Sequence, residues 1–187
     1  MNIISQFYKD LLKNRIINEI NNISNELANN IVNNLFNIDI NKYLNLISSI
    51  QSNAYKLIRN VIVASFENID EQYRNSNLRK KYYSINKSNV PRTLVTIFGD
   101  ITYKRTYYKS KLDGSYHFML DELFELPSYD HYDPIVKGIA IDKAFSTNQQ
   151  QSGKDTGELF TNLALLSSEN RYINQIPRQS IYNWIKK

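Results

Sequence analysis

Residues 92–109 read RTLVTIFGDITYKRTYYK, and this stretch has the pattern of two strands joined by a turn. From Arg92 to Phe98 the apolar side chains alternate between two faces, which is the period-2 pattern of a β-strand. In residues 101–109, β-branched residues and tyrosines alternate with lysine and arginine, which predicts a second strand. Gly99 and Asp100 between them are typical of the central residues of a two-residue hairpin turn. With a third strand expected at Tyr116–Leu120, the sequence predicts a small antiparallel sheet within residues 92–132.

The residues before this sheet have helical periodicity. Isoleucine and leucine recur every three or four residues from Ile16 to Leu35, and apolar residues do so again from Tyr43 to Phe66. Capping residues at Asn37–Asp39 separate the two runs, so residues 1–74 are expected to form two long antiparallel helices that serve assembly. Residues 75–91 are polar and basic and end in a proline, and we interpret them as a linker.

Residues 133–187 return to the helical period and outline three short helices. The first begins at Asp133-Pro134, a capping residue followed by a proline in the first turn. The second is expected over residues 156–168, after a polar connector at 147–153, and the third over residues 177–187. This outline is typical of a helix-turn-helix module, whose last helix reads base edges in the major groove.

The last of these helices carries the candidate base-reading residues. Ile181, Trp184 and Ile185 lie at helical spacing and are expected to face the core. Arginine pairs with guanine, and glutamine or asparagine with adenine, through two hydrogen bonds each, while tyrosine suits phosphate oxygens. The outward-facing candidates are Arg178, Gln179, Tyr182 and Asn183. An ordinary amphipathic helix at the end of a domain has the same pattern, so both interpretations stay open at this point.

Together these elements predict an α+β fold that is mostly α. A long helical hairpin comes first, a small antiparallel β region second, and a trihelical module resembling a helix-turn-helix last. No apolar run approaches the roughly 20 residues that cross a bilayer, and the N-terminus lacks the features of a secretory signal. We therefore expect a cytoplasmic protein without a membrane partner.

Charge is distributed unevenly along the chain. The formal net charge is +5, but residues 72–111 hold ten Lys and Arg against Asp100 alone, and residues 112–133 hold six acids without a Lys or Arg. A strongly basic block is typical of a polyanion-binding surface, because each cation near a phosphate releases counterions. The candidate phosphate contacts are Arg79, Lys80, Lys81, Arg92, Lys104, Arg105, Lys109 and Lys111. In the alternative, the acidic block neutralises the basic one within the fold.

The sequence offers no recognisable catalytic site. It has no cysteine, which excludes thiol catalysis, disulfides and thiolate metal sites. We interpret His117 and His131 as surface or sheet residues. The acids of residues 112–133 lie on one connector, whereas two-metal chemistry needs carboxylates that converge from separate elements. We therefore predict no catalytic residue, metal ligand or cofactor in this chain.

The pattern around the strand pair is more specific than its composition. It reads Arg92-Thr93-x-x-Thr96-x-Phe98-Gly99-Asp100-Ile101-x-Tyr103-x-Arg105-x-Tyr107-Tyr108, followed by Leu120-Asp121-Glu122-Leu123. This pattern resembles bacterial insertion-sequence transposases of the ISLre group, long catalogued as an uncharacterised protein family. The resemblance extends over residues 67–187 and includes the ending Ser180-Ile181-Tyr182-Asn183-Trp184. It implies a helical N-terminal region, the strand pair and a trihelical DNA-binding module. In the family an RNase-H-like domain with an Asp/Asp/Glu site for divalent metal, Mg, comes after them.

The chain ends at Lys187, where the family's catalytic domain would begin. No position inherits a catalytic carboxylate, so we expect a truncated or frameshifted copy, or one fragment of a split gene, that is not active alone. The implied role is to bind double-stranded DNA at the element's terminal repeats and to form a homo-oligomer through residues 1–70. Two other interpretations stay open: a helical protein-interaction domain without nucleic-acid binding, and a residual repressor of transposition.

Overall fold

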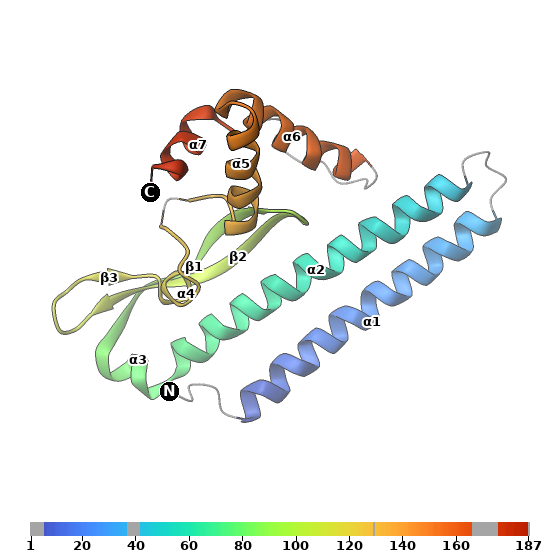
Figure 1. The fold of residues 1–187 in the computed structure, drawn as a ribbon. Helices are drawn as coiled ribbons and strands as arrows, with labels where there is room; N and C mark the ends of the chain where they lie inside the picture. The colour runs from blue at the N-terminus through green and yellow to red at the C-terminus, as the bar shows by residue number, and fades with distance from the viewer. Residues whose placement is uncertain (1–5, 37–41, 129, 166–175, 187) are drawn as a thin grey trace. The chain divides into compact units, whose positions relative to one another are not determined.

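The computed structural model describes residues 6–36, 42–128, 130–165 and 176–186 (Figure 1). In these ranges the chain is mostly helical with one three-stranded antiparallel sheet, which confirms the predicted fold class. The chain divides into two compact units. The first comprises Met1–Asn22, Ile58–Leu94 and Ile101–His131, and the second comprises Ile23–Leu57, Val95–Asp100 and Tyr132–Lys187.

The two long helices, α1 (Gln6–Phe36) and α2 (Lys42–Asn75), run antiparallel, as their periodicity predicts. Within the first unit, Arg15 of α1 lies 3.4 Å from the Glu67 carboxylate of α2. Within the second unit, Lys56 of α2 lies 2.7 Å from the Glu26 carboxylate of α1. The residue of α1 that is later in the chain, Glu26, thus contacts the earlier residue of α2, Lys56, as expected for antiparallel helices. The predicted break at Asn37–Asp39 lies outside the described residues.

The sheet has the order β1–β2–β3, formed by β1 (Tyr83–Thr96), β2 (Gly99–Ser110) and β3 (Tyr116–His117). The turn between β1 and β2 differs from the prediction, because Ile97 and Phe98 occupy it. The Thr96 hydroxyl donates to the Gly99 carbonyl at 2.7 Å and accepts from the Phe98 N–H at 3.1 Å. Gly99 then takes a φ of 113°, a conformation that favours glycine. The predicted turn was therefore wrong by two residues.

Residues 75–91 do not form the linker that their composition indicates. They contribute α3 (Asn77–Tyr82) and the first part of β1. The Ser76 side chain accepts from the Arg79 N–H at 3.1 Å and so caps α3. The Ser84 hydroxyl donates to the Lys109 carbonyl at 3.3 Å, between β1 and β2. Most side chains of this part of β1 are exposed, so the polar composition reflects solvent exposure on a paired strand.

A fourth helix, α4 (Met119–Leu123), stands where we predicted that the third strand would continue. The strand ends at His117, and Phe118 occupies the N-cap position of α4. Asp121 and Glu122 lie in the first turn, where negative charge favours a helix. The predicted strand at Tyr116–Leu120 is therefore only partly correct.

The first unit has its own apolar core between α2, the sheet and α4. Leu94 of β1, Tyr103 of β2 and Leu120 of α4 are nearly or fully buried in it, together with Ile101. The α2 side chains packed against this cluster are Ile62, Val63, Phe66 and Ile69. These residues fix the sheet on one side of α2.

Carboxylates of α2 bind backbone groups of β2. The Glu67 carboxylate accepts from the Lys104 N–H at 3.1 Å. The Asp70 carboxylate accepts from the Thr106 N–H at 3.0 Å and from its hydroxyl at 2.6 Å. Burial raises the pKa of Asp70, against the opposing effect of the Thr106 hydrogen bonds. These contacts satisfy strand donors that would otherwise need a further strand or water.

The second unit contains α5 (Pro134–Ser146), α6 (Gln149–Leu165) and α7 (Arg178–Ile185), grouped together in Figure 1. The Asp133 carboxylate accepts from the Val136 N–H at 2.7 Å, which confirms the predicted cap of α5. Helix α6 starts earlier than predicted, because Asn148 accepts from two N–H groups of its first turn at 3.0 and 3.1 Å. The connection from α6 to α7 lies outside the described residues.

The core of the second unit is buried and apolar. Ile176 and Ile181 are fully buried near α6 and α7, and Trp184 packs against the cluster. The Trp184 ring lies 5.3 Å from the Tyr132 ring in an edge-to-face arrangement. The remaining buried members are Val95, Val136 and Ala140. Ile185, expected in this core, is 38% exposed.

We expect Gly153→Ala to destabilise the second unit. Gly153 accepts from the Ile176 N–H at 3.2 Å, and a Cβ at position 153 would overlap the Ile176 carbonyl. The overlap should lower the free energy of unfolding by about 1–3 kcal/mol in a denaturant titration. The matched control is Gly138→Ala, because a Cβ there would meet nothing within 4 Å. This control should raise helix stability by about 0.5–1 kcal/mol. Equal effects of the two substitutions would contradict the packing argument.

Candidate nucleic-acid interface

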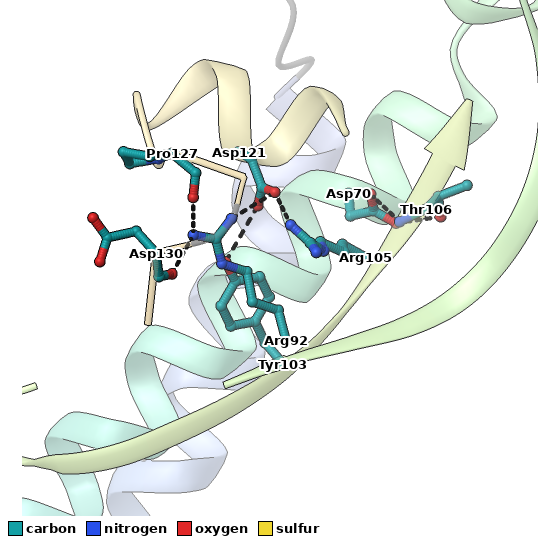
Figure 2. Close-up of polar contacts among 8 residues, drawn as sticks. All are labelled: Asp70, Arg92, Tyr103, Arg105, Thr106, Asp121, Pro127 and Asp130. Carbon is teal, nitrogen blue, oxygen red and sulfur yellow. Dashed lines mark hydrogen bonds and ion pairs between the residues drawn. The ribbon is translucent and has the colours of Figure 1, made fainter. Parts of the chain in front are cut away.

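Two of the predicted phosphate contacts form a buried ionic cluster (Figure 2). Arg92 of β1 and Arg105 of β2 are 6% and 8% exposed. Both pair with the Asp121 carboxylate of α4, and the Arg92 guanidinium lies 2.6 Å from it. A buried guanidinium in this arrangement is not available to a phosphate. The prediction that Arg92 and Arg105 contact DNA phosphates is therefore wrong.

Neighbouring groups hold the two arginines in place. Arg92 donates to the carbonyls of Pro127 and Asp130 at 2.8 and 2.9 Å. The Arg105 guanidinium carbon lies 3.6 Å from the centre of the Phe118 ring, a cation–π contact. The Tyr103 hydroxyl lies 3.4 Å from Asp121 and completes the cluster.

The cluster holds two positive charges and one negative charge. Burial and the positive charge of Arg92 lower the pKa of Arg105. Asp121 therefore partly neutralises the basic block, as the alternative interpretation of the charge pattern requires. Other acids of residues 112–133 have different partners: Glu122 pairs with His117, and Asp133 caps α5.

Five other predicted cations belong to α3 and to the end of β2 in the first unit. Lys111, just after β2, donates from its backbone N–H to the Tyr82 carbonyl at 2.9 Å. Its ammonium group donates to the Lys80 carbonyl at 2.7 Å, so the end of β2 lies against α3. We call this group the basic cluster, and its members are Arg79, Lys80, Lys81, Lys109 and Lys111. Arg79 is half-buried and the four lysines are exposed.

Lys104 is exposed, but it lies in the middle of β2, whereas Lys109 and Lys111 of the basic cluster lie at or just after its end. Its backbone N–H donates to Glu67, and its side chain points to the opposite face from those of Tyr103 and Arg105, because neighbouring strand residues alternate. The structure thus separates the eight predicted phosphate contacts into two buried, one exposed on β2 and five in the basic cluster.

The four predicted base-reading residues lie on the exposed face of α7. Arg178, Gln179, Tyr182 and Asn183 are all exposed, as their spacing predicts. The Gln179 side-chain amide donates to the Asn183 carbonyl oxygen at 3.0 Å, one turn further along. The Lys186 ammonium lies 4.4 Å from the centre of the Tyr182 ring. These contacts place hydrogen-bonding groups and positive charge on one side of the helix.

Sequence reasoning missed a polar relay beside the sheet. One nitrogen of His117 lies 2.7 Å from the Glu122 carboxylate, and the other lies 2.6 Å from the Ser115 hydroxyl. Ser115 and His117 are two residues apart in an extended segment, and this spacing is the one sequence signal that could have placed them on one face. The Ser115 hydroxyl donates to Asp113 at 2.7 Å. Hydrogen bonds from Ser110 and Ser115 lower the pKa of Asp113 to about 2, so Asp113 accepts as a carboxylate.

The proton count shows what this relay does. A hydroxyl has one proton, and Ser115 uses it in the hydrogen bond that it donates to the Asp113 carboxylate. Because that proton is already in a hydrogen bond to Asp113, the Ser115 hydroxyl is not positioned to give it to His117, although the order of groups is that of a hydrolase triad. The relay connects the turn before β3 to α4.

The described part of the chain contains no group of three or more His, Cys, Asp or Glu side chains that could hold a metal ion. It also contains no helix with the length and hydropathy of a membrane span.

Residues 32–176 match the model of a family described as "Uncharacterised protein family (UPF0236)". The chain belongs to this family. Two UPF0236 proteins of Caldanaerobacter subterraneus subsp. tengcongensis are each 33% identical to it over 118 residues, which cover 62% of this chain and 25% of the relative. A third UPF0236 protein from that organism is 30% identical over 109 residues, which cover 58% and 23%. The matched part therefore spans about a quarter of these curated relatives. No solved structure matches the chain significantly.

The buried cluster yields a stability prediction for this UPF0236 chain. Asp121→Asn leaves Arg92 and Arg105 buried without their shared counter-charge. Removing one partner of a buried ion pair costs about 3–5 kcal/mol, and we expect a loss of that size in urea unfolding. Glu125→Gln is the matched control, because it removes the same charge from an exposed side chain. An Asp121→Asn variant as stable as the control would show that the cluster is not a structural requirement.

Proposed function

We propose that this UPF0236 chain is the DNA-binding and assembly part of an insertion-sequence transposase, and that it acts in the cytoplasm without a catalytic site of its own. The basic cluster is the observation that carries the proposal. Arg79, Lys80, Lys81, Lys109 and Lys111 come from α3 and the end of β2, two segments that the hydrogen bonds of Lys111 join. Cations on two adjoining segments suit a run of phosphates. The resemblance of the strand-pair motif to ISLre-group transposases supports the same conclusion.

We propose that helix α7 of the second unit recognises the base sequence of the DNA. Helix α7 has a buried side at Ile181 and an exposed side with arginine and amide groups. Such groups pair with base edges in the major groove, while contacts to phosphates set the position of the protein. We assign base contacts to Arg178, Gln179, Tyr182 and Asn183, and phosphate contacts to the basic cluster. A repressor that occupies the element's ends would use the same surfaces.

The long helices are proposed to form a homo-oligomer. A stripe of α2 in the second unit is apolar and exposed, with Tyr43, Leu44 and Ile47 being 74%, 61% and 41% exposed. On α1 in the same unit, Phe36 is 82% exposed. Large exposed apolar side chains on neighbouring turns mark contact surfaces. A second copy of the helical region is the partner that we assign to them.

Binding to duplex DNA should depend steeply on salt. Several phosphate contacts cost about 10³-fold or more in affinity between about 50 and 200 mM salt, and fluorescence anisotropy on a terminal-repeat duplex measures this. Lys80→Gln should lower the slope of log affinity against log salt by about one. Lys13→Gln, an exposed lysine of α1, is the charge-matched control and should leave the slope unchanged. A flat salt dependence would favour the alternative of a protein-interaction domain without nucleic-acid binding.

Base reading by α7 is tested by Arg178→Ala. The Arg178 side chain is exposed, and it donates to the Gln149 side chain in a long hydrogen bond of 3.5 Å. The variant should therefore fold normally. We expect it to lose about 1–3 kcal/mol of binding free energy on the terminal repeat and little on random duplex of the same length. An equal loss on both duplexes would reassign Arg178 to the phosphate backbone.

A further inference from the structure

An aromatic ladder lies on one face of the sheet in the first unit. The Tyr107 ring of β2 is stacked on Tyr116 of β3, with centroids 5.1 Å apart and planes 18° apart. On Phe118 it is stacked at 4.5 Å and 30°. The Arg105 guanidinium continues the series 3.6 Å from the centre of the Phe118 ring. Three rings and one guanidinium thus form a continuous stack across β2, β3 and the start of α4.

The two ends of the ladder differ in exposure. Arg105, at one end, is buried and paired with Asp121. Tyr116, at the other end, is 49% exposed, and Tyr107 and Phe118 between them are half-buried. The stack is therefore fixed from inside the unit and presents its last ring to solvent. A flat ligand that adds to it orders few additional side chains, which lowers the entropic cost of binding.

A positive charge lies beside the exposed end. Lys109 is paired with Tyr116 across β2 and β3, and its ammonium lies 5.6 Å from the Tyr116 ring centre. Lys109 belongs to the basic cluster, whose other lysines stand on α3 and at Lys111. The acids nearest in sequence have other partners, since Asp113 accepts from Ser115 and Glu122 from His117. The exposed ring therefore lies beside cations that suit a phosphate backbone.

Aromatic rings beside a basic groove are the features by which proteins bind single-stranded nucleic acid. Each base stacks on a ring, and lysines follow the phosphates. In duplex DNA the base faces are already stacked on each other and are not open to such a ring. We propose that the Tyr116 end of the ladder binds an unpaired base of single-stranded DNA, whose backbone contacts Lys109 and Lys111. This inference rests on the proposed DNA-binding function and adds a second DNA form to it.

The test compares single-stranded and duplex DNA on the full chain. The single-stranded probe is a fluorescent oligothymidylate of about twelve nucleotides, a length within the usual site size. Tyr116→Leu keeps an apolar side chain but removes the ring, and it should weaken oligothymidylate binding about tenfold or more. Binding to the terminal-repeat duplex should stay unchanged in this variant. Because Tyr116 is half exposed, the fold should tolerate the change.

Two matched variants separate stacking from other effects. Tyr116→Phe keeps the ring and should bind oligothymidylate as the unchanged chain does. Phe145→Leu removes a ring that is 78% exposed on α5 and should also have no effect. If Tyr116→Leu binds oligothymidylate as tightly as Tyr116→Phe while duplex binding persists, the stacking proposal is overturned and the proposed function stands. If the unchanged chain binds neither DNA form at low salt, the proposed function fails and this inference fails with it.

Discussion

The contact of Asp121 with Arg92 and Arg105 is the constraint on which the first unit depends. One carboxylate of α4 holds guanidinium groups from two neighbouring strands, at a depth where a lone charge is costly. Because Arg92 also binds the Pro127 and Asp130 carbonyls, the segment after α4 is held by the same group. The cluster also decides which cations remain at the surface. It removes two positive charges from the basic block and leaves, among others, the basic cluster on α3 and the end of β2.

A similar use of charge explains how the sheet meets α2. Glu67 and Asp70 accept from the Lys104 and Thr106 N–H groups, so two acids of α2 serve as hydrogen-bond acceptors for a strand. A three-stranded sheet with one two-residue strand has few partners for its outer donors, and side-chain carboxylates supply them. Acids at these positions therefore stabilise β2 and do not lie among the lysines at its far end. The same two carboxylates therefore hold β2 against α2 and keep negative charge away from the lysines at the end of β2.

Sequence patterns could identify the elements whose causes are local. The periods of three to four and of two gave the long helices and the strand pair, and Asp133-Pro134 gave the start of α5. The hairpin turn was misplaced because the Thr96 hydroxyl binds both the Gly99 carbonyl and the Phe98 N–H, which places Ile97 and Phe98 in the turn. In the sequence, Arg92 and Arg105 cannot be told from exposed arginines of a basic strand. Their burial depends on the pairing with Asp121 of α4, which is a contact between distant residues. The stack of Tyr116, Tyr107 and Phe118 was not predicted either. The predicted strand ran to Leu120, but β3 ends at His117 and Phe118 lies outside it.

The two units carry different kinds of surface that we propose to face DNA, and each has its own core. Helix α7 is fixed by Ile181 and Trp184 in one core, whereas the basic cluster and the ladder are fixed by the Asp121 contacts and the packing of α2 in the other. A phosphate-binding surface needs charge but little precision, because electrostatic attraction acts over a Debye length of about 10 Å. Base reading and ring stacking need side chains held to a fraction of that distance. Rigid buried residues stand directly behind α7 and behind the ladder, which is where the proposed contacts demand precision.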